Sequence, residues 1–132
     1  MAAQLEIAER RAGAVTVLTL SGRLVADEAD YLFKQHIDAL IADARVNIVI
    51  DFRNVSSIDS GGVGTLVAKL LSARRAGGDL RLATLTDRTR RVLEITRLVN
   101  VFHVFESVEA ALHSYAADVP RLTAGIAGPT WQ

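Results

Sequence analysis

Cysteine is absent from the 132 residues of this chain, so disulfides, thiolate metal sites and cysteine nucleophiles are excluded. Aromatic residues make up only 5% of the chain, so the core must be built from Leu, Val, Ile and Ala. No apolar run approaches the ~20 residues that a membrane-spanning helix needs. The first residues lack the basic-then-apolar pattern of a signal peptide. We therefore expect a cytoplasmic protein of one domain with no membrane span.

An excess of charge of either sign is also missing, because 15 basic residues balance 15 acidic ones. Eight of the nine basic residues after position 60 nevertheless lie between Lys69 and Arg97. A stretch of this kind is either an ordinary solvated surface or a surface that steers an acidic partner. No aromatic platform is interleaved with the arginines, so direct binding of nucleic acid is not expected.

Alternation of apolar and polar residues indicates strands, and apolar residues at helical spacing indicate helices. The expected strands lie near residues 5–7, 15–20, 46–50, 80–85 and 101–105, and the expected helices near residues 27–41, 60–76, 87–98 and 107–115. The first two strands should form a hairpin around Ala12-Gly13. Strands that then alternate with helices predict an α/β fold: a mostly parallel sheet of four or five strands, with an N-terminal hairpin and helices packed on the sheet.

The helical pattern stops at Asp118, and prolines and glycines recur after it. We predict a domain over residues 1–117 and a flexible C-terminal tail over residues 118–132. Trp131, near the end of that tail, is either simply exposed or an anchor that docks on a partner.

The stretch Asp59-Ser60-Gly61-Gly62-Val63-Gly64 joins a buried strand to an amphipathic helix. Phosphate is stabilised at a helix start, where backbone N–H groups and the helix dipole face it, so Ser60 is a candidate phosphorylation site. Serine is also a preferred N-cap, and capping alone could explain Ser60. We expect Gly64 to permit a tight turn and close packing of the helix on the sheet. Gly61 and Gly62 serve either that packing or space for a partner or a phosphate.

Nucleotide-binding and catalytic patterns do not fit this stretch. A phosphate-binding loop ends in Gly-Lys-Ser/Thr, but here Gly64 is followed by Thr65, and a dinucleotide fingerprint needs a glycine where Val67 stands. A hydrolase would need a histidine beside Ser60. The three histidines are scattered over separate predicted elements: His36, His103 and His113. We therefore predict no enzyme activity, no catalytic residue, no metal site and no cofactor.

The run Val55-Ser56-Ser57-Ile58-Asp59-Ser60-Gly61-Gly62-Val63-Gly64 resembles the signature of STAS domains. More narrowly, it resembles that of bacterial anti-sigma factor antagonists. Residues 20–24, 77–80 and 91–98 carry the same resemblance in the order expected of the family, and the resemblance extends over about residues 5–115.

The resemblance implies a STAS fold and a partner switch controlled by phosphorylation. In that switch an anti-sigma factor serine kinase phosphorylates the serine after the aspartate, here Ser60, and a serine phosphatase resets it. The unphosphorylated protein binds the anti-sigma factor and frees the sigma factor for transcription. The residues expected to contact the partner are Asp59, Gly61, Gly62, Arg23, Val25 and Asp27. The sequence does not decide between a monomer and a homodimer.

Two places depart from the family pattern. Gly61 stands where members usually carry Ser or Thr. Arg23 and Val25 stand where members tend to carry an acidic pair, and Asp27 or Glu28 would have to replace the lost carboxylates. The departures leave a second function open, namely a non-switching STAS scaffold or an accessory subunit of a stress-signalling or transporter complex.

Overall fold

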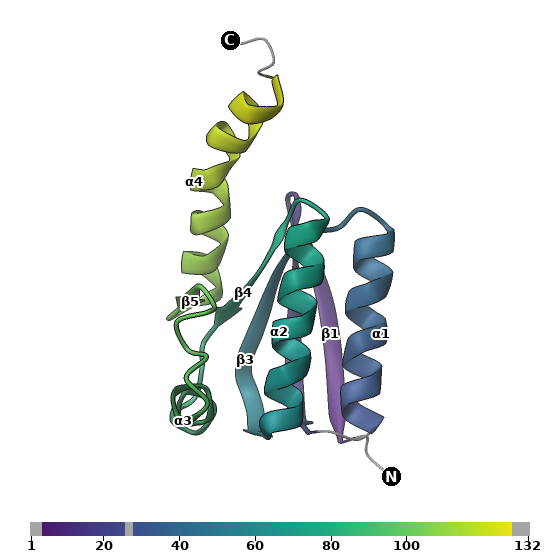
Figure 1. The fold of residues 1–132 in the computed structure, drawn as a ribbon, viewed down its shortest axis with the longest axis vertical. Coiled ribbons are helices and arrows are strands. Elements are labelled where there is room, and N and C mark those ends of the chain that lie inside the picture. Colours follow the sequence, from purple (N-terminus) through teal and green to yellow (C-terminus); the bar gives the residue numbers. More distant parts are fainter. Residues whose placement is uncertain (1–3, 26–27, 128–132) are drawn as a thin grey trace.

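The computed structural model describes residues 4–25 and 28–127 and contains a five-stranded sheet with the order β1-β2-β3-β4-β5 (Figure 1). The strands are β1 (Leu5–Ala12), β2 (Val15–Leu24), β3 (Asn47–Ile58), β4 (Asp79–Ala83) and β5 (Val104–Phe105). The helices are α1 (Glu28–Ala42), α2 (Ser60–Arg75), α3 (Asp87–Ile95) and α4 (Val108–Ala127). β1 is antiparallel to β2, and all later neighbours are parallel. The predicted α/β fold with its N-terminal hairpin is confirmed.

The middle strand β3 is buried on both faces, which explains its near-continuous apolar sequence. Successive side chains of a strand point to opposite faces of the sheet. Ile48 and Ile50 accordingly join the larger core cluster, whereas Val49, which lies between them, joins a smaller cluster on the other face. Strands of this kind need helices on both sides.

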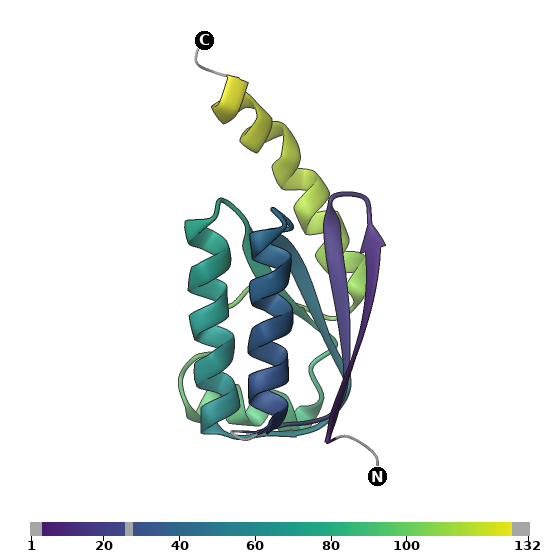
Figure 2. The ribbon, with the colours of Figure 1, turned by 90° about the vertical axis from the view of Figure 1, so that its right-hand side faces the viewer.

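The helices cover the two faces unequally. α1 and α2 lie side by side on one face (Figure 2), where Phe33 of α1 and Leu70 of α2 are fully buried in the larger cluster together with Leu93 of α3. The other face is covered by α4, whose Ala111 and Tyr115 pack in the smaller cluster. In both views the C-terminal part of α4 continues past the end of the sheet.

All five strands differ in length from the prediction: β1, β2 and β3 continue past the expected residues 7, 20 and 50, whereas β4 and β5 are shorter than expected. β4 ends at Ala83 instead of Leu85 because Thr84 adopts a φ of 56°, which is incompatible with extended backbone. The last strand is limited to two residues, so His103 precedes it. Phe102 is buried in the larger core although it lies outside a strand. Its apolar side chain therefore reflects burial and not strand structure.

The last helix also differs, because it continues to Ala127 instead of ending before Asp118. Pro120 and Gly125 predict an end of the helix, but good helix formers such as Arg121, Leu122 and Ala124 stand around them. Trp131 lies outside the described residues. The domain boundary at residue 117 and the flexibility of the segment after it stay predictions.

A buried hydroxyl ties α4 to the sheet. Tyr115 Oη lies 2.8 Å from the carbonyl oxygens of both Ile48 and Asp79, and it accepts the Ile48 N–H at 3.2 Å. Burial raises the pKa of the Tyr115 hydroxyl, and the negative charge of Asp79 adds to that rise. The hydroxyl therefore stays protonated and joins the ends of two neighbouring parallel strands.

We expect Tyr115→Phe to lower the free energy of unfolding by about 1–3 kcal/mol, because buried polar groups of the backbone lose their partner. Urea unfolding followed by circular dichroism measures the change. Tyr31→Phe is the matched control, since Tyr31 is 59% exposed and should change stability by less than about 0.5 kcal/mol. Equal effects of the two substitutions would contradict a special role for the Tyr115 hydroxyl.

Candidate functional site

The site predicted from sequence lies where β2 and β3 end and α2 begins, at the lower end of α2 in Figure 1. The last residues of β2 pair in register with the last residues of β3: Arg23 stands opposite Ser57, and Leu24 stands opposite Ile58. The structure thus brings the 23–25 segment beside the stretch that holds Ser60. Ligands of parallel sheets commonly bind outside these carboxyl ends.

The structure decides which residue caps α2. Asp59 is the N-cap: its side chain Oδ1 accepts the N–H of Gly62 at 2.8 Å, and its carbonyl accepts the N–H of Val63 at 3.0 Å. Ser60 is instead the first helical residue, so capping does not explain it. Its side chain is exposed, and its hydroxyl makes no hydrogen bond within residues 4–25 and 28–127.

The packing role lies with Gly62, where it was one of two expected roles, and not with Gly64. A Cβ on Gly62 would lie 2.3 Å from the carbonyl oxygen of Leu24 and 3.0 Å from Ile58 Cγ1, so Gly62 permits the close approach of α2 to the end of β2. A Cβ on Gly64 would meet nothing within 4 Å, and Gly64 is exposed. The packing role predicted for Gly64 is therefore wrong, and Gly62 carries it.

Another glycine fixes the segment that carries Arg23. Gly22 adopts a φ of 114°, and a Cβ there would lie 2.0 Å from the carbonyl oxygen of Gln4. That carbonyl accepts the N–H of Arg23 at 2.8 Å. The Arg23 side chain is exposed and Val25 is half-buried, whereas Asp27 and the side chain of Glu28 lie outside the described residues.

Sequence reasoning missed Arg88, which the structure adds to this site. Its guanidinium Nη1 donates to the carbonyl oxygen of Ser56 at 3.4 Å, and Ser56 Oγ donates to the carbonyl oxygen of Gly22 at 3.1 Å. Arg88 is one of the basic residues between Lys69 and Arg97. Its position beside the end of β3 depends on how α3 packs against β3.

A polar contact holds the start of α2 against α1. Thr65 Oγ1 donates to Asp30 Oδ1, and the other carboxylate oxygen of Asp30 pairs with Lys34 Nζ at 3.1 Å. Thr65 is buried, so this contact satisfies a hydroxyl that would otherwise be costly. The surface around Ser60 is therefore carried by a well-supported helix end.

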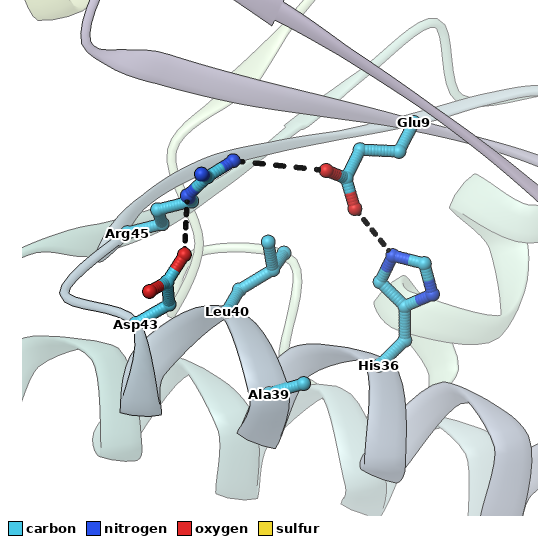
Figure 3. Close-up of a pocket in the computed structure, with 6 residues that line it drawn as sticks. All are labelled: Glu9, His36, Ala39, Leu40, Asp43 and Arg45. Atoms are coloured by element: carbon cyan, nitrogen blue, oxygen red, sulfur yellow. Dashed lines mark hydrogen bonds and ion pairs between the residues drawn. The ribbon is translucent and has the colours of Figure 1, made fainter.

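A second polar cluster lies between α1 and β1 (Figure 3). It surrounds a cavity of about 310 Å³, and His36 Nε2 lies 2.7 Å from Glu9 Oε1. Arg45 lies 4.0 Å from the other oxygen of Glu9 and 2.9 Å from Asp43. These polar groups satisfy one another, so the cavity is a weak candidate for a ligand. Among the described residues no group of three His, Asp or Glu side chains could hold a metal ion.

Comparison with known families decides the class of this protein. The STAS domain profile matches residues 6–111, which include the hairpin, the Ser60 loop and the first turn of α4. The chain belongs to the STAS domain family. No helix of this STAS protein, over the residues that the structure describes, is long and apolar enough to cross a membrane.

Relatives of this STAS protein carry the names of regulatory proteins. It is 29% identical over 97 residues to a Thermotoga neapolitana protein provisionally named an anti-sigma factor antagonist homologue, which covers 73% of this chain and 86% of the relative. The anti-sigma F factor antagonist of Paenibacillus polymyxa is 23% identical over 109 residues, or 83% of this chain and 92% of the relative. Bacillus SpoIIAA in its phosphorylated form shares the fold, with a TM-score of 0.66 at 20% identity over 83% of this chain and 99% of that one.

Proposed function

We propose that this STAS protein is an anti-sigma factor antagonist that acts in the cytoplasm through a switch at Ser60. An anti-sigma factor serine kinase phosphorylates Ser60, and a serine phosphatase removes the phosphate. The unphosphorylated protein binds the anti-sigma factor and so frees a sigma factor. The family and the names of the two relatives support this role. The observation that carries it is the exposed Ser60 hydroxyl at the first position of α2, where Asp59 and not Ser60 is the N-cap.

A phosphate at Ser60 would be compatible with the fold. It adds roughly −1.5 to −2 charges at the start of a helix, where the dipole and the backbone N–H groups stabilise negative charge. Asp59 already occupies one of those N–H groups through its bond to Gly62. The phosphate therefore stays at the surface, where it changes what can dock there.

The same phosphate would oppose docking. A partner seated over Ser60 would have to desolvate the phosphate or meet its charge beside the carboxylate of Asp59. A difference of a few kcal/mol between the two forms is enough to change the protein from mostly bound to mostly free. The switch thus needs no change in backbone structure.

We expect Ser60→Asp to weaken binding of the anti-sigma factor by about tenfold or more, and Ser60→Ala to leave binding within about twofold. A pull-down from the native organism with the wild-type protein identifies the partner by mass spectrometry. Titration calorimetry with the purified partner then measures the affinity of each variant. Thermal unfolding should be nearly unchanged in both variants, because Ser60 is exposed.

Equal affinities of wild-type and Ser60→Asp protein would oppose a charge switch and favour a non-switching scaffold. Aspartate carries less charge than phosphate, so protein phosphorylated by the captured kinase provides the stronger comparison. Mass spectrometry of that sample must place the phosphate on Ser60. A phosphate on a neighbouring serine, such as Ser56 or Ser57, would contradict the assignment.

A further inference from the structure

Two guanidinium groups lie near the end of β3 that leads to Ser60. Arg23 stands at the end of β2 and Arg88 in the first turn of α3, and both side chains are exposed. Within residues 4–25 and 28–127, neither forms an ion pair with a carboxylate. Four other arginines of the described residues differ in this respect, because each pairs with a carboxylate: Arg45, Arg53, Arg74 and Arg81.

The two guanidinium groups belong to one continuous surface. Arg88 donates to the carbonyl of Ser56, the Ser56 hydroxyl donates to the carbonyl of Gly22, and Arg23 follows Gly22 in the chain. Arg23 also stands opposite Ser57 in the register of β2 and β3. Ser56 and Ser57 belong to the last residues of β3, so both arginines lie beside the strand end that leads through Asp59 to Ser60.

Among the described residues, the carboxylates near this surface form no ion pair with either arginine. Asp59 is oriented toward the backbone N–H of Gly62, and Asp30 is shared between Thr65 and Lys34. Asp87 stands next to Arg88 in the first turn of α3, where the N-terminal dipole favours it. Exposed cations without ion pairs are the ordinary complement of an acidic surface on a partner.

We propose that the surface around Ser60 binds an acidic segment of the partner protein, with Arg23 and Arg88 as the contacts that recognise its carboxylates. The inference rests on the proposed function, in which this surface is the docking face. It also gives the phosphate a second effect: negative charge at Ser60 would neutralise the arginines as well as repel the acidic segment.

A synthetic hexaglutamate peptide tests the surface without any knowledge of the partner. We expect the peptide to shift the ¹⁵N–¹H resonances of residues 22–25, 56–62 and 86–90 in the full-length protein. The shifts should vanish in about 1 M NaCl, where the Debye length falls to about 3 Å. They should also weaken several-fold in Arg23→Glu and in Arg88→Glu. Shifts centred on other arginines, such as Arg75 or Arg97, or shifts that persist in both variants, would overturn the proposal.

The partner captured by the wild-type protein provides the second measurement. Arg23→Glu should weaken its binding by about tenfold, chiefly through slower association. Arg10→Glu is the matched control, because Arg10 is an exposed strand arginine of β1 toward the hairpin turn and should leave affinity within about twofold. Equal or tighter binding by Arg23→Glu would also overturn the proposal. If Arg23→Glu weakens binding but Ser60→Asp does not, the acidic contact stands and the phosphorylation switch fails.

Discussion

Gly62→Ala is expected to lower the free energy of unfolding by about 3 kcal/mol, at the upper end of the usual cost of overpacking. The added methyl group would lie 2.3 Å from the carbonyl oxygen of Leu24, which belongs to backbone in a strand. The methyl group would also lie 3.0 Å from Ile58 Cγ1, and Ile58 cannot move aside freely because it is buried in the core. Relief of the contact therefore requires α2 to move away from β2.

Gly64→Ala provides the control within the same helix. A methyl group there meets nothing within 4 Å, so the substitution affects stability only through the conformational freedom of the backbone. Alanine restricts the unfolded chain more than glycine does, and Gly64→Ala should therefore raise stability by about 0.5–1 kcal/mol. Urea unfolding of both variants measures the difference. Two variants that change stability in the same direction would show that α2 does not approach Leu24 as closely as described.

A functional consequence follows from the same contact. Movement of α2 away from β2 would shift Ser60 relative to Arg23, which the register of β2 and β3 holds in place. Under conditions where Gly62→Ala is fully folded, we expect its affinity for the partner to fall, whereas Gly64→Ala should bind as the wild-type protein does. This comparison separates the geometry of the site from its charge.

The order of strands and helices could be predicted because periodicity is a local property of the sequence. The residues of β3 alternate between two cores, and those of α2 repeat at helical spacing, so each pattern identifies its element without knowledge of the fold. The end of each element depends on more distant contacts. Thr84 ends β4 through an unusual φ, and nothing in the neighbouring residues distinguishes it from a strand residue.

The position of Ser60 could also be predicted, but its role within the helix start could not. Asp59 and Ser60 are both good N-cap residues, and only the observed bond from Gly62 to the Asp59 carboxylate selects between them. The packing role of Gly62 depends on Leu24, which is remote in sequence. The sequence does not distinguish Arg88 from the nearby arginines, because Ser56, which it contacts, lies far away in the chain.

Asp118 is the first residue after the predicted domain boundary, and its side chain contacts the sheet through Arg81. Asp118 Oδ2 accepts a hydrogen bond from Arg81 Nη2 at 2.5 Å. Arg81 Nε donates to Asp79 Oδ2 at 2.9 Å, Nη1 donates to Ser114 Oγ at 2.7 Å, and its Cζ lies 4.0 Å from the centre of the Tyr115 ring. Burial lowers the pKa of Arg81, but the bonds to Asp118 and Asp79 outweigh it and leave the pKa raised.

Arg81→Met is expected to lower the free energy of unfolding by about 3 kcal/mol, because two carboxylates lose a shared cation. Loss of the cation costs more at Asp79 than at Asp118, since the Asp79 side chain is only 12% exposed. Asp79 keeps its bond from Arg74, which limits the loss. Arg91→Met is the matched control: Arg91 is exposed on α3, and its replacement should change stability by less than about 0.5 kcal/mol.

Asp118→Asn in the full-length protein separates the contribution of α4 from that of the sheet. We expect a smaller loss of about 1–2 kcal/mol, because the Asp118 side chain is 24% exposed and Arg81 keeps Asp79 as a partner. If Arg81 and Asp118 act together, the double substitution should cost less than the sum of the single ones. Strict additivity would show that the two side chains act independently. A loss for Asp118→Asn as small as that of Arg91→Met would support the predicted boundary at residue 117, since α4 would then contribute nothing measurable through Asp118.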